Sequence, residues 1–590
     1  MASSKSKQDM NQGWGNRLWL SIFLFVGVTL AGCNMGPEFQ AAGNESPPLR
    51  SIPDLKNITL RGELGTRWAS ATANLLTRPD RYSLDSYRAN ASGTPGALWP
   101  DWPGDQFGRM FSVMHVAEGY GWSSVPRLRQ AVAGVVLPVQ TEDGNFGPRL
   151  GLDQQDSRII SGNAFALRGL MDAYKDSGEA RYLEAARRLA RYYEATFETW
   201  EEKGEGGPVH EFYGHCLDGL VRLHELGGDA WALDLAKRIA HLAGRTSHTH
   251  HSLSLYRGVI DLYRVTKDAG LLEKAEDYLK WCRDSRIVTG GLPENMPAYY
   301  QDEGCALADY LVVNLMMFRA TGRDDFLEDA ERVLVNHLFM NQFVTGGFGH
   351  RLFAPDIIGA KGWQGWDGRF GSENPGCCSL WGQWGLGQAG RYIITRQGNA
   401  AEVNLFAAAD VGLPDIGTRL EIRSDFPAMK AAVITVRCDR PAKFELRLRR
   451  PAWAEGISVK VNGKEVEAGP PGSRITMERT WKSGDKVEMT FRSGLRLVPW
   501  PAAGSDRAAV FDGPLCLGLS SAAADVDAYD SLLVDAQANL VLAADGQPQV
   551  IGNDGQIICR LRPICEDWQS PDVANPNRLR VLFLLKKGSI

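Results

Sequence analysis

Leu167 to Tyr193 reads LRGLMDAYKDSGEARYLEAARRLARYY, and this stretch decides the fold. Apolar residues recur in it at positions i, i+3, i+4 and i+7, which is the spacing of an amphipathic helix. A Ser-Gly turn interrupts the pattern, an acidic residue follows, and the pattern then resumes. The stretch therefore predicts a helical hairpin, which is two helices joined by a short turn.

Three later stretches repeat this arrangement, and they are Leu217 to Ala240, Tyr256 to Cys282 and Ala308 to Phe339. Repeated hairpins build either an open solenoid or a closed ring. The segments between them are rich in glycine, histidine and aromatic residues, which favours a closed α/α toroid whose loops gather at one mouth. These segments are 203–216, 244–252 and 289–305.

The earlier part of the chain would complete the ring. Apolar periodicity predicts further helices near 64–78, 105–119 and 124–138. The toroid would then resemble a six-hairpin barrel and occupy residues 56–398.

The pattern changes near residue 400, where apolar and polar residues begin to alternate as in a β-strand. Asn462-Gly463 separates two such runs and predicts a tight hairpin. We expect an antiparallel β-sandwich over 399–497 and a second β segment over 498–590. The predicted fold class is therefore multidomain α + β, with an N-terminal α/α toroid and C-terminal antiparallel β-sandwich domains.

The second β segment is less regular than the sandwich. Strands are expected within Ala508 to Leu519 and over Leu579 to Lys586. Residues 520–577 have too little periodicity for any element to be assigned to them.

The N-terminus resembles a bacterial lipoprotein signal. A basic head precedes the apolar run Leu18 to Leu30, and Leu30-Ala-Gly-Cys33 resembles a lipobox. We expect a signal peptide over 1–32, a lipid on the Cys33 thiol and a tether over 33–55. An uncleaved signal anchor is the alternative. The lipid would hold the protein in the cell envelope, and the sequence does not say on which membrane or face.

The composition excludes one class of partner and is compatible with another. The net charge of −5 gives no positive footprint for nucleic acid. The 17 tryptophans suit either a carbohydrate cleft or ordinary packing. Of the 10 cysteines, nine would remain as thiols in the mature chain, because the Cys33 thiol would carry the lipid, and an odd number argues against a complete disulfide framework. Nothing in the composition indicates the oligomeric state.

Four residues form a candidate metal site. Glu303 and Cys305 make a Glu-x-Cys pair, and Cys377 and Cys378 are adjacent. Adjacent Cα atoms are about 3.8 Å apart, below the roughly 4.4 Å at which disulfides begin, so a bond between the pair would be strained. Three thiolates and a carboxylate suit tetrahedral zinc, and a metal would keep a thiol in its nucleophilic thiolate form. The alternative is a set of buried free cysteines that act as small apolar side chains.

Several short motifs follow one another along the chain. They are His210-Glu-Phe-Tyr213, Val288-Thr-Gly-Gly291, Asp302-Glu-Gly-Cys305, Cys377-Cys378, Arg449-Arg-Pro-Ala-Trp453, Val461-Asn-Gly463, Trp481-Lys-Ser-Gly-Asp485 and Asp512-Gly-Pro514. Each alone is weak, but the ordered set resembles glycoside hydrolase family 127, the β-L-arabinofuranosidase-type enzymes, over residues 60–520. The resemblance implies an α/α toroid followed by β-sandwich domains, in agreement with the fold predicted above.

The resemblance also implies a role for each matching residue. Glu303, Cys305, Cys377 and Cys378 would bind zinc, and Cys377 would be the nucleophile in place of one of the two carboxylates that most retaining glycosidases use. The intermediate would be a thioglycoside. Glu294, shortly after the Thr-Gly-Gly loop, occupies the place of the family's acid/base.

The sequence departs from the family in this loop. The stretch from Glu294 to Glu303 is shorter than in the family, and a proline precedes Glu294. Glu373 and Asp302 are therefore alternative acid/base residues, and the sugar specificity is open because loops at the mouth shape the pocket.

Histidines are the expected substrate contacts. His210 and His250 would bind sugar hydroxyl groups, although His248 and His251 compete with His250 for the matching place in the family loop. A second metal site in this run is disfavoured, because no thiol or carboxylate accompanies the histidines at ligand spacing.

These features together predict an exported hydrolase that removes terminal β-L-arabinofuranosyl or related sugars from glycans with retention. Two alternatives remain open. Another α/α-toroid enzyme, such as a polysaccharide lyase or an unsaturated uronyl hydrolase, would need a Tyr/His or Asp pair and no cysteines. A catalytically altered glycan-binding lipoprotein would fit the changed Glu294 loop but not the intact cysteine set.

The lipobox gives the first testable prediction. Cys33→Ser should abolish lipidation and release the protein from the membrane fraction, because one thiol carries the whole signal. Fractionation followed by a high-salt wash measures this. A variant that stays on the membrane after the wash would show that the lipobox interpretation is wrong.

Overall fold

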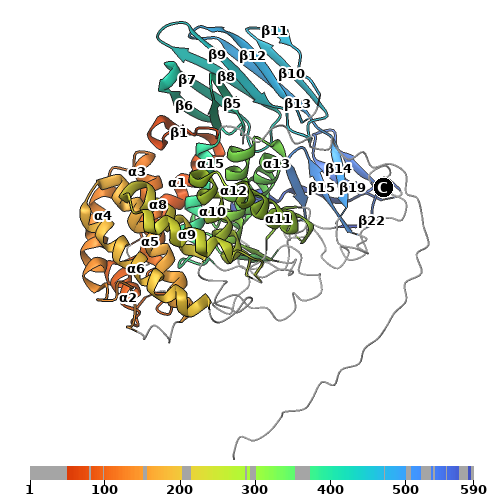
Figure 1. Cartoon of the computed structure of the whole chain (residues 1–590). Helices are drawn as coiled ribbons and strands as arrows, with labels where there is room; N and C mark the ends of the chain where they lie inside the picture. Colours follow the sequence, from red (N-terminus) through yellow and green to blue (C-terminus); the bar gives the residue numbers. More distant parts are fainter. Residues whose placement is uncertain are drawn as a thin grey trace, which may run out of the picture. The chain divides into compact units, whose positions relative to one another are not determined.

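The computed structural model describes most of the chain from residue 49 onward, as a ring of helices followed by β-sheets (Figure 1). The described residues are 49–78, 82–97, 99–149, 156–201, 214–246, 248–285, 289–292, 301–352, 373–470, 472–499, 507–519, 533–535, 539–552, 554–569 and 583–585.

Six of the described helices form the inner wall of the ring. Each contacts the next one along the chain, and the last contacts the first, which closes the ring. The inner helices are mostly buried; α12, for example, is buried along nearly its whole length. They are α3 (Asp105–Gly119), α5 (Ser157–Ser177), α8 (Leu217–Gly227), α10 (Thr249–Thr266), α12 (Gly304–Thr321) and α15 (Cys378–Arg391).

An outer helix packs against each inner one, so the predicted α/α toroid is confirmed. Two short elements, Val333–Leu338 and α14 (Phe339–Asn341), extend the last outer helix, and α2 (Leu84–Ser92) packs beside α3 and α4. The outer helices are α1 (Gly62–Leu76), α4 (Val125–Val136), α6 (Ala180–Glu201), α9 (Ala230–His241), α11 (Ala269–Ser285) and α13 (Asp324–Arg332). The helices expected before residue 140 correspond to α1, α3 and α4, whereas α2 was not predicted.

The turns inside the hairpins follow from single residues. Gly178, Gly228 and Gly322 end α5, α8 and α12 with φ of 70°, 75° and 76°, a left-handed conformation that only glycine adopts without a steric penalty. Lys267 adopts φ 61° in the same position after α10. The three glycines are the second residues of the Ser-Gly, Gly-Gly and Thr-Gly pairs that predicted the turns.

A β-sandwich follows the ring. Its larger sheet has the strand order β1-β6-β7-β8-β13-β10-β11, and its smaller sheet has the order β12-β9-β5-β4. Asn462 and Gly463, with φ of 50° and 81°, form the predicted hairpin turn between β10 and β11. The strands are β4 (Ile394–Gln397), β5 (Ala400–Val403), β6 (Ala409–Leu413), β7 (Thr418–Ser424), β8 (Ala431–Cys438), β9 (Ala442–Arg449), β10 (Gly456–Val461), β11 (Lys464–Val466), β12 (Arg474–Trp481) and β13 (Lys486–Arg492).

The N-terminal segment is part of the β region. Strand β1 (Ile58–Leu60) pairs with β6 and forms the edge of the larger sheet. Arg50, which lies in the predicted tether, is buried and donates to the Glu402 carboxylate at 2.6 Å. Residues 49–60 therefore join the sandwich. The predicted signal peptide and Cys33 lie outside the described residues. No helix among the described residues combines the length and apolarity needed to cross a bilayer.

The last β segment forms two further sheets. One is built around β15 and includes β22, which lies within the predicted final strand, and the other is β18-β19-β20. The stretch from 520 to 577 thus contains strands that its sequence did not reveal. The elements are β14 (Leu495–Pro499), β15 (Arg507–Asp512), β16 (Leu515–Gly518), β17 (Leu533–Val534), β18 (Leu540–Leu542), β19 (Pro548–Ile551), β20 (Ile557–Arg560), β21 (Arg562–Pro563), a 3-10 helix Ile564–Gln569 and β22 (Phe583–Leu585).

The ring contains a very close helix contact, between α3 and α5. A Cβ at Gly169 would stand 2.2 Å from the backbone oxygen of Gly108. We expect Gly169→Ala to lower the free energy of unfolding by at least about 2 kcal/mol, because backbone atoms cannot move aside as a side chain can. Denaturant unfolding followed by circular dichroism measures the change.

Gly134 in α4 provides the matched control for this prediction. It is exposed, and a Cβ there would meet nothing within 4 Å. Gly134→Ala should therefore stabilise the protein by about 0.5–1 kcal/mol through helix propensity. Equal unfolding midpoints for the two variants would contradict the packing argument.

Candidate active site

The structure brings the four predicted metal ligands together. One ligand atom from each of Glu303, Cys305, Cys377 and Cys378 lies within 4.8 Å of all the others. The Sγ atoms of Cys305 and Cys378 are 3.6 Å apart, and those of Cys377 and Cys378 are 3.8 Å apart. Thiolates that bind tetrahedral zinc with bonds of about 2.3 Å stand about 3.8 Å from one another, so the spacing fits this metal.

Two helix N-termini position the cluster. Glu303 ends β2 (Gln301–Glu303) and precedes α12, whose first turn contains Cys305. Cys377 precedes α15, whose first residue is Cys378. A helix N-terminus carries a positive partial charge, so both helices stabilise the anionic forms of the ligands.

The loop before Cys377 is held by its own side chains. The Asn374 Oδ1 atom accepts hydrogen bonds from the backbone N–H groups of Gly376 at 3.1 Å and Cys377 at 3.3 Å. Ser379 donates to the backbone oxygen of Phe348 at 3.1 Å. These bonds fix the double cysteine relative to β3 (His350–Leu352), which pairs with β2 and places His350 opposite Glu303.

The three thiols differ in their electrostatics. Hydrogen bonds from Cys305 and Cys378, together with the positive charges of Arg109 and His350, hold the pKa of Cys377 well below its usual range. Burial raises the pKa of Cys305 and of Cys378. Cys377 is also the partly exposed member, whereas the other two are buried. The thiol suited to act as nucleophile is therefore the one that reaches the surface.

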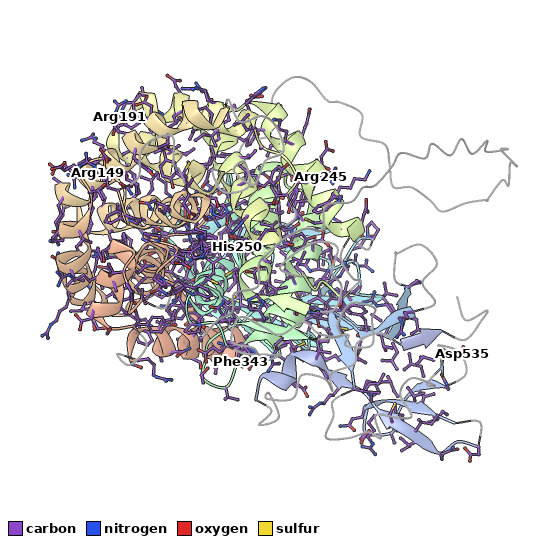
Figure 2. All side chains as sticks on the ribbon, turned by 90° about the horizontal axis from the view of Figure 1, so that it is seen from below. Arg149, Arg191, Arg245, His250, Phe343 and Asp535 are labelled. Carbon is purple, nitrogen blue, oxygen red and sulfur yellow. The ribbon has the colours of Figure 1, made fainter. Side chains whose placement is uncertain are left out.

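A pocket opens onto the cluster at the N-terminal ends of the inner helices. His250, which Figure 2 shows in the interior of the ring, is one of its walls. Its lining combines the cluster with aromatic, cationic and acidic side chains, as expected of a carbohydrate site. The lining residues are Trp99, Trp102, Asp105, Arg109, Ser161, His248, His250, His251, Glu303, Asn374 and Cys377.

His250 is held rigidly in this wall. Its Nδ1 atom lies 2.7 Å from the Asp309 carboxylate, and its Nε2 atom lies 3.1 Å from the Arg109 guanidinium. The ring stacks on Phe165 with an interplanar angle of 15°. His248 and His251 stack on each other at 3.7 Å and also line the pocket. His248, His250 and His251 thus all reach the site, whereas His210, the fourth histidine considered for substrate contact, lies outside the described residues.

The acid/base candidates fall into different environments. Glu294 lies outside the described residues. Asp302 precedes Glu303 on β2, and its side chain points to the opposite side because alternate residues of a strand do so. It is fully buried, accepts a hydrogen bond from the Leu292 N–H and lies 2.6 Å from the His337 Nδ1 atom. Glu373 accepts from Thr345 and Asn74 at 2.8 and 3.1 Å. Neither Asp302 nor Glu373 is among the described residues that line the pocket.

The sequence did not reveal the side of the pocket formed by residues before 110. Asp105 and Arg109 form an ion pair at 2.8 Å one turn apart at the start of α3. Burial raises the pKa of Asp105 to about 6, although Arg109 opposes the rise. Trp99 lies directly against Gly376, where a Cβ would stand 1.2 Å from the indole nitrogen. The sequence feature that could have indicated this side of the pocket is the Trp- and Pro-rich run over 99–104, directly before Asp105.

Models of two successive domains match this chain, and both belong to the same family. The model of the GH127 β-L-arabinofuranosidase catalytic domain matches residues 163–350, and that of the GH127 middle domain matches residues 400–493. No curated protein matches the sequence.

Solved structures share the fold over nearly the whole chain. A GH127 β-arabinofuranosidase is 17% identical with a TM-score of 0.68, and the alignment covers 91% of this chain and 98% of that one. The GH127 β-L-arabinofuranosidase from Geobacillus stearothermophilus T6 is 15% identical with a TM-score of 0.71, covering 90% and 100%. At such identities the similarity shows the fold alone.

The geometry predicts stoichiometric metal. Protein purified without chelator should carry about one zinc per chain, and Cys305→Ser should lose it, because the variant removes one of three thiolates. Elemental analysis measures the metal. Cys438→Ser is the matched control, since Cys438 is a free thiol on β8 outside the cluster. Wild-type protein with no stoichiometric metal would contradict the prediction.

Proposed function

The chain belongs to glycoside hydrolase family 127 and is a glycosidase, and from this premise we propose that it removes terminal β-L-arabinofuranosyl or similar five-membered-ring sugars from glycans, with retention of configuration. The observation that carries the proposal is the position of Cys377. It is the only thiol of the cluster that lines the pocket, whereas Cys305 and Cys378 are buried.

The donor set suits zinc, which Glu303, Cys305, Cys377 and Cys378 would bind. When bound, zinc lowers the pKa of a thiol, so that Cys377 is a thiolate at neutral pH. The positive N-termini of α12 and α15 act in the same direction.

The reaction has two displacements. In the first, the Cys377 sulfur attacks the anomeric carbon, a C–S bond forms, the C–O bond breaks, and the Glu294 carboxyl group gives its proton to the leaving oxygen. In the second, the Glu294 carboxylate takes a proton from water, the water oxygen attacks the same carbon, and the C–S bond breaks. Each displacement inverts the carbon, so the product has the original configuration.

Other pocket residues bind and orient the sugar. The His250 ring is fixed by Asp309 and Arg109, so a hydroxyl group that bonds to it meets a preorganised partner. The indoles of Trp99 and Trp102 offer flat apolar surfaces on which the face of a sugar ring stacks.

Two other functions explain the site less well. A lyase or an unsaturated uronyl hydrolase has no use for a cluster of three thiols and a carboxylate. A catalytically altered glycan-binding lipoprotein would have no need to keep Cys377 at the pocket wall with a lowered pKa. We also propose that the protein is exported and anchored through a lipid on Cys33, on the basis of the lipobox.

Two substitutions test the chemistry. Cys377→Ser should lower turnover by several orders of magnitude, because an alcohol is a far weaker nucleophile than a thiolate. Glu294→Gln should retain zinc yet lose about 10²–10⁴-fold on a glycan with a poor leaving group. Aryl pentofuranosides with good leaving groups should show a smaller loss in the first step, because their leaving oxygen needs little protonation. Steady-state hydrolysis and metal content are the measurements.

Glu373→Gln is the control, because Glu373 lies outside the pocket lining. It should keep near-normal turnover on the same glycan. Near-normal turnover of Glu294→Gln, with a large loss in Glu373→Gln, would reverse the assignment.

A further inference from the structure

A second cavity, of about 350 Å³, lies at the opposite end of the ring from the pocket. It is lined by residues near the C-terminal ends of α5, α8, α10, α12 and α15, and by Ser51 and Ile52 from the N-terminal segment. Cys378 and Arg391 bound α15, and 13 helical residues rise about 20 Å, so the two sites are well separated. We call this second site the cationic cavity.

The cationic cavity is strongly basic. Of its 17 lining residues, seven are arginine or lysine and two are glutamate or aspartate. Some of the cations have carboxylate partners in the ring. Arg222 pairs with Asp172, and the Arg257 guanidinium donates to Asp218 at 3.0 Å and also pairs with Asp309.

Three cations of the cavity have no carboxylate partner in the described part of the chain, and they are Lys175, Arg319 and Arg391. The Arg319 Nε atom donates to the backbone oxygen of Arg50 at 2.8 Å. The Arg391 Nη1 atom donates to the Gln388 side chain at 3.2 Å. Neither acceptor carries a charge, so the positive charge of these groups is not balanced by a direct contact.

Buried donors in the same cavity also lack acceptors. Arg257 is 1% exposed, and its Nη2 atom has no hydrogen-bond partner among the described residues; the same holds for Nε of Arg391. An unsatisfied buried donor costs about 1–3 kcal/mol, more when it is charged. Two charged donors in residues that line the cavity thus have no acceptor among the described residues.

Compensation of helix dipoles explains the positions of the cations but not their free donors. Lys175, Arg319 and Arg391 each lie in the last turn of an inner helix, where a cation is favourable. A dipole, however, supplies no lone pair to an N–H group that faces a cavity. Burial and the nearby positive charges of Arg222 and Arg391 lower the pKa of Lys175, although Asp172 and Asp176 oppose the fall.

We propose that the cationic cavity binds an oxyanion of the phosphate or sulfate type. Guanidinium groups from Arg319 and Arg391 offer planar pairs of donors that match two oxygens of such an anion. Lys175, which is exposed at the rim, adds a point charge. The anion would also lie near Lys175, Arg319 and Arg391, which have no carboxylate partner among the described residues.

The oxyanion has two possible sources, free phosphate and the headgroup of a phospholipid. Ser51 and Ile52, which line the cavity, belong to the same N-terminal part of the chain as Cys33. If Cys33 carries a lipid, as proposed above, phospholipid headgroups are among the anions that the protein meets. The lipid source therefore rests on the proposed anchoring, whereas the anion site does not.

Calorimetric titration with inorganic phosphate and with sulfate tests the site, on the full chain carrying Cys33→Ser and at constant ionic strength. We expect saturable binding that Lys175→Gln and Arg391→Gln each weaken about tenfold, the effect of losing one charge-assisted pair. Lys443→Gln, at an exposed position on β9, should bind as the wild type does. Direct titration is needed because phosphate and sulfate stabilise proteins nonspecifically.

Vesicles identify the source. The site is assigned to a lipid phosphate if the protein binds phosphatidylglycerol but not phosphatidylcholine vesicles and Lys175→Gln weakens this binding. It is assigned to the free anion if the protein binds phosphate but does not bind vesicles. No saturable binding of either kind, or equal binding by all variants, overturns the proposal. Hydrolysis and zinc content, measured on the same variants, should be unchanged, so failure here is distinguishable from failure of the proposed function.

Discussion

The constraint on which the structure depends is the common direction of the inner helices. Helices α3, α5, α10, α12 and α15 all begin at the pocket, as the positions of Asp105, Ser161, His250, Glu303 and Cys377 show. Their dipoles therefore point the same way and add. The positive ends surround a cluster of potential anions, and the negative ends surround a cluster of arginines. The chemistry of both ends follows from the topology of the ring, in which each hairpin brings the chain back so that the next inner helix begins on the same side.

A buried ionic layer separates the two ends. Its centre is Asp309, which accepts hydrogen bonds from Ser254, His250 and the Trp381 indole at 2.7–2.9 Å and also pairs with Arg257. These contacts lower the pKa of Asp309, so that it stays ionised although it is fully buried. Charges at this depth are tolerated only when their partners are fixed. The layer therefore fixes the orientation of His250 through Asp309 and fills the interior of the ring with buried, paired charges.

Much of this arrangement was predictable because local signals determine it. The turn glycines, the Asn462-Gly463 hairpin and the Cys377-Cys378 pair each act within a few residues, and their patterns survive in the sequence. The side of the pocket around Asp105 was not predicted, because an ion pair one helical turn apart looks the same on any surface. The cationic cavity was missed for a similar reason, since its arginines are spread over five helices and meet only in three dimensions.

The edge strand β1 has a consequence for the order of events during synthesis. Arg61, directly after this strand, bonds to Asp410, which is 349 residues later in the chain. The strand cannot find its partner until the entire helical ring has been made, so it must wait as an exposed, three-residue segment. Contacts of such long range form slowly. Strand β1 is thus made before the ring and takes its place in the sheet after it. The ring cannot be cut from the sandwich without leaving that sheet edge open.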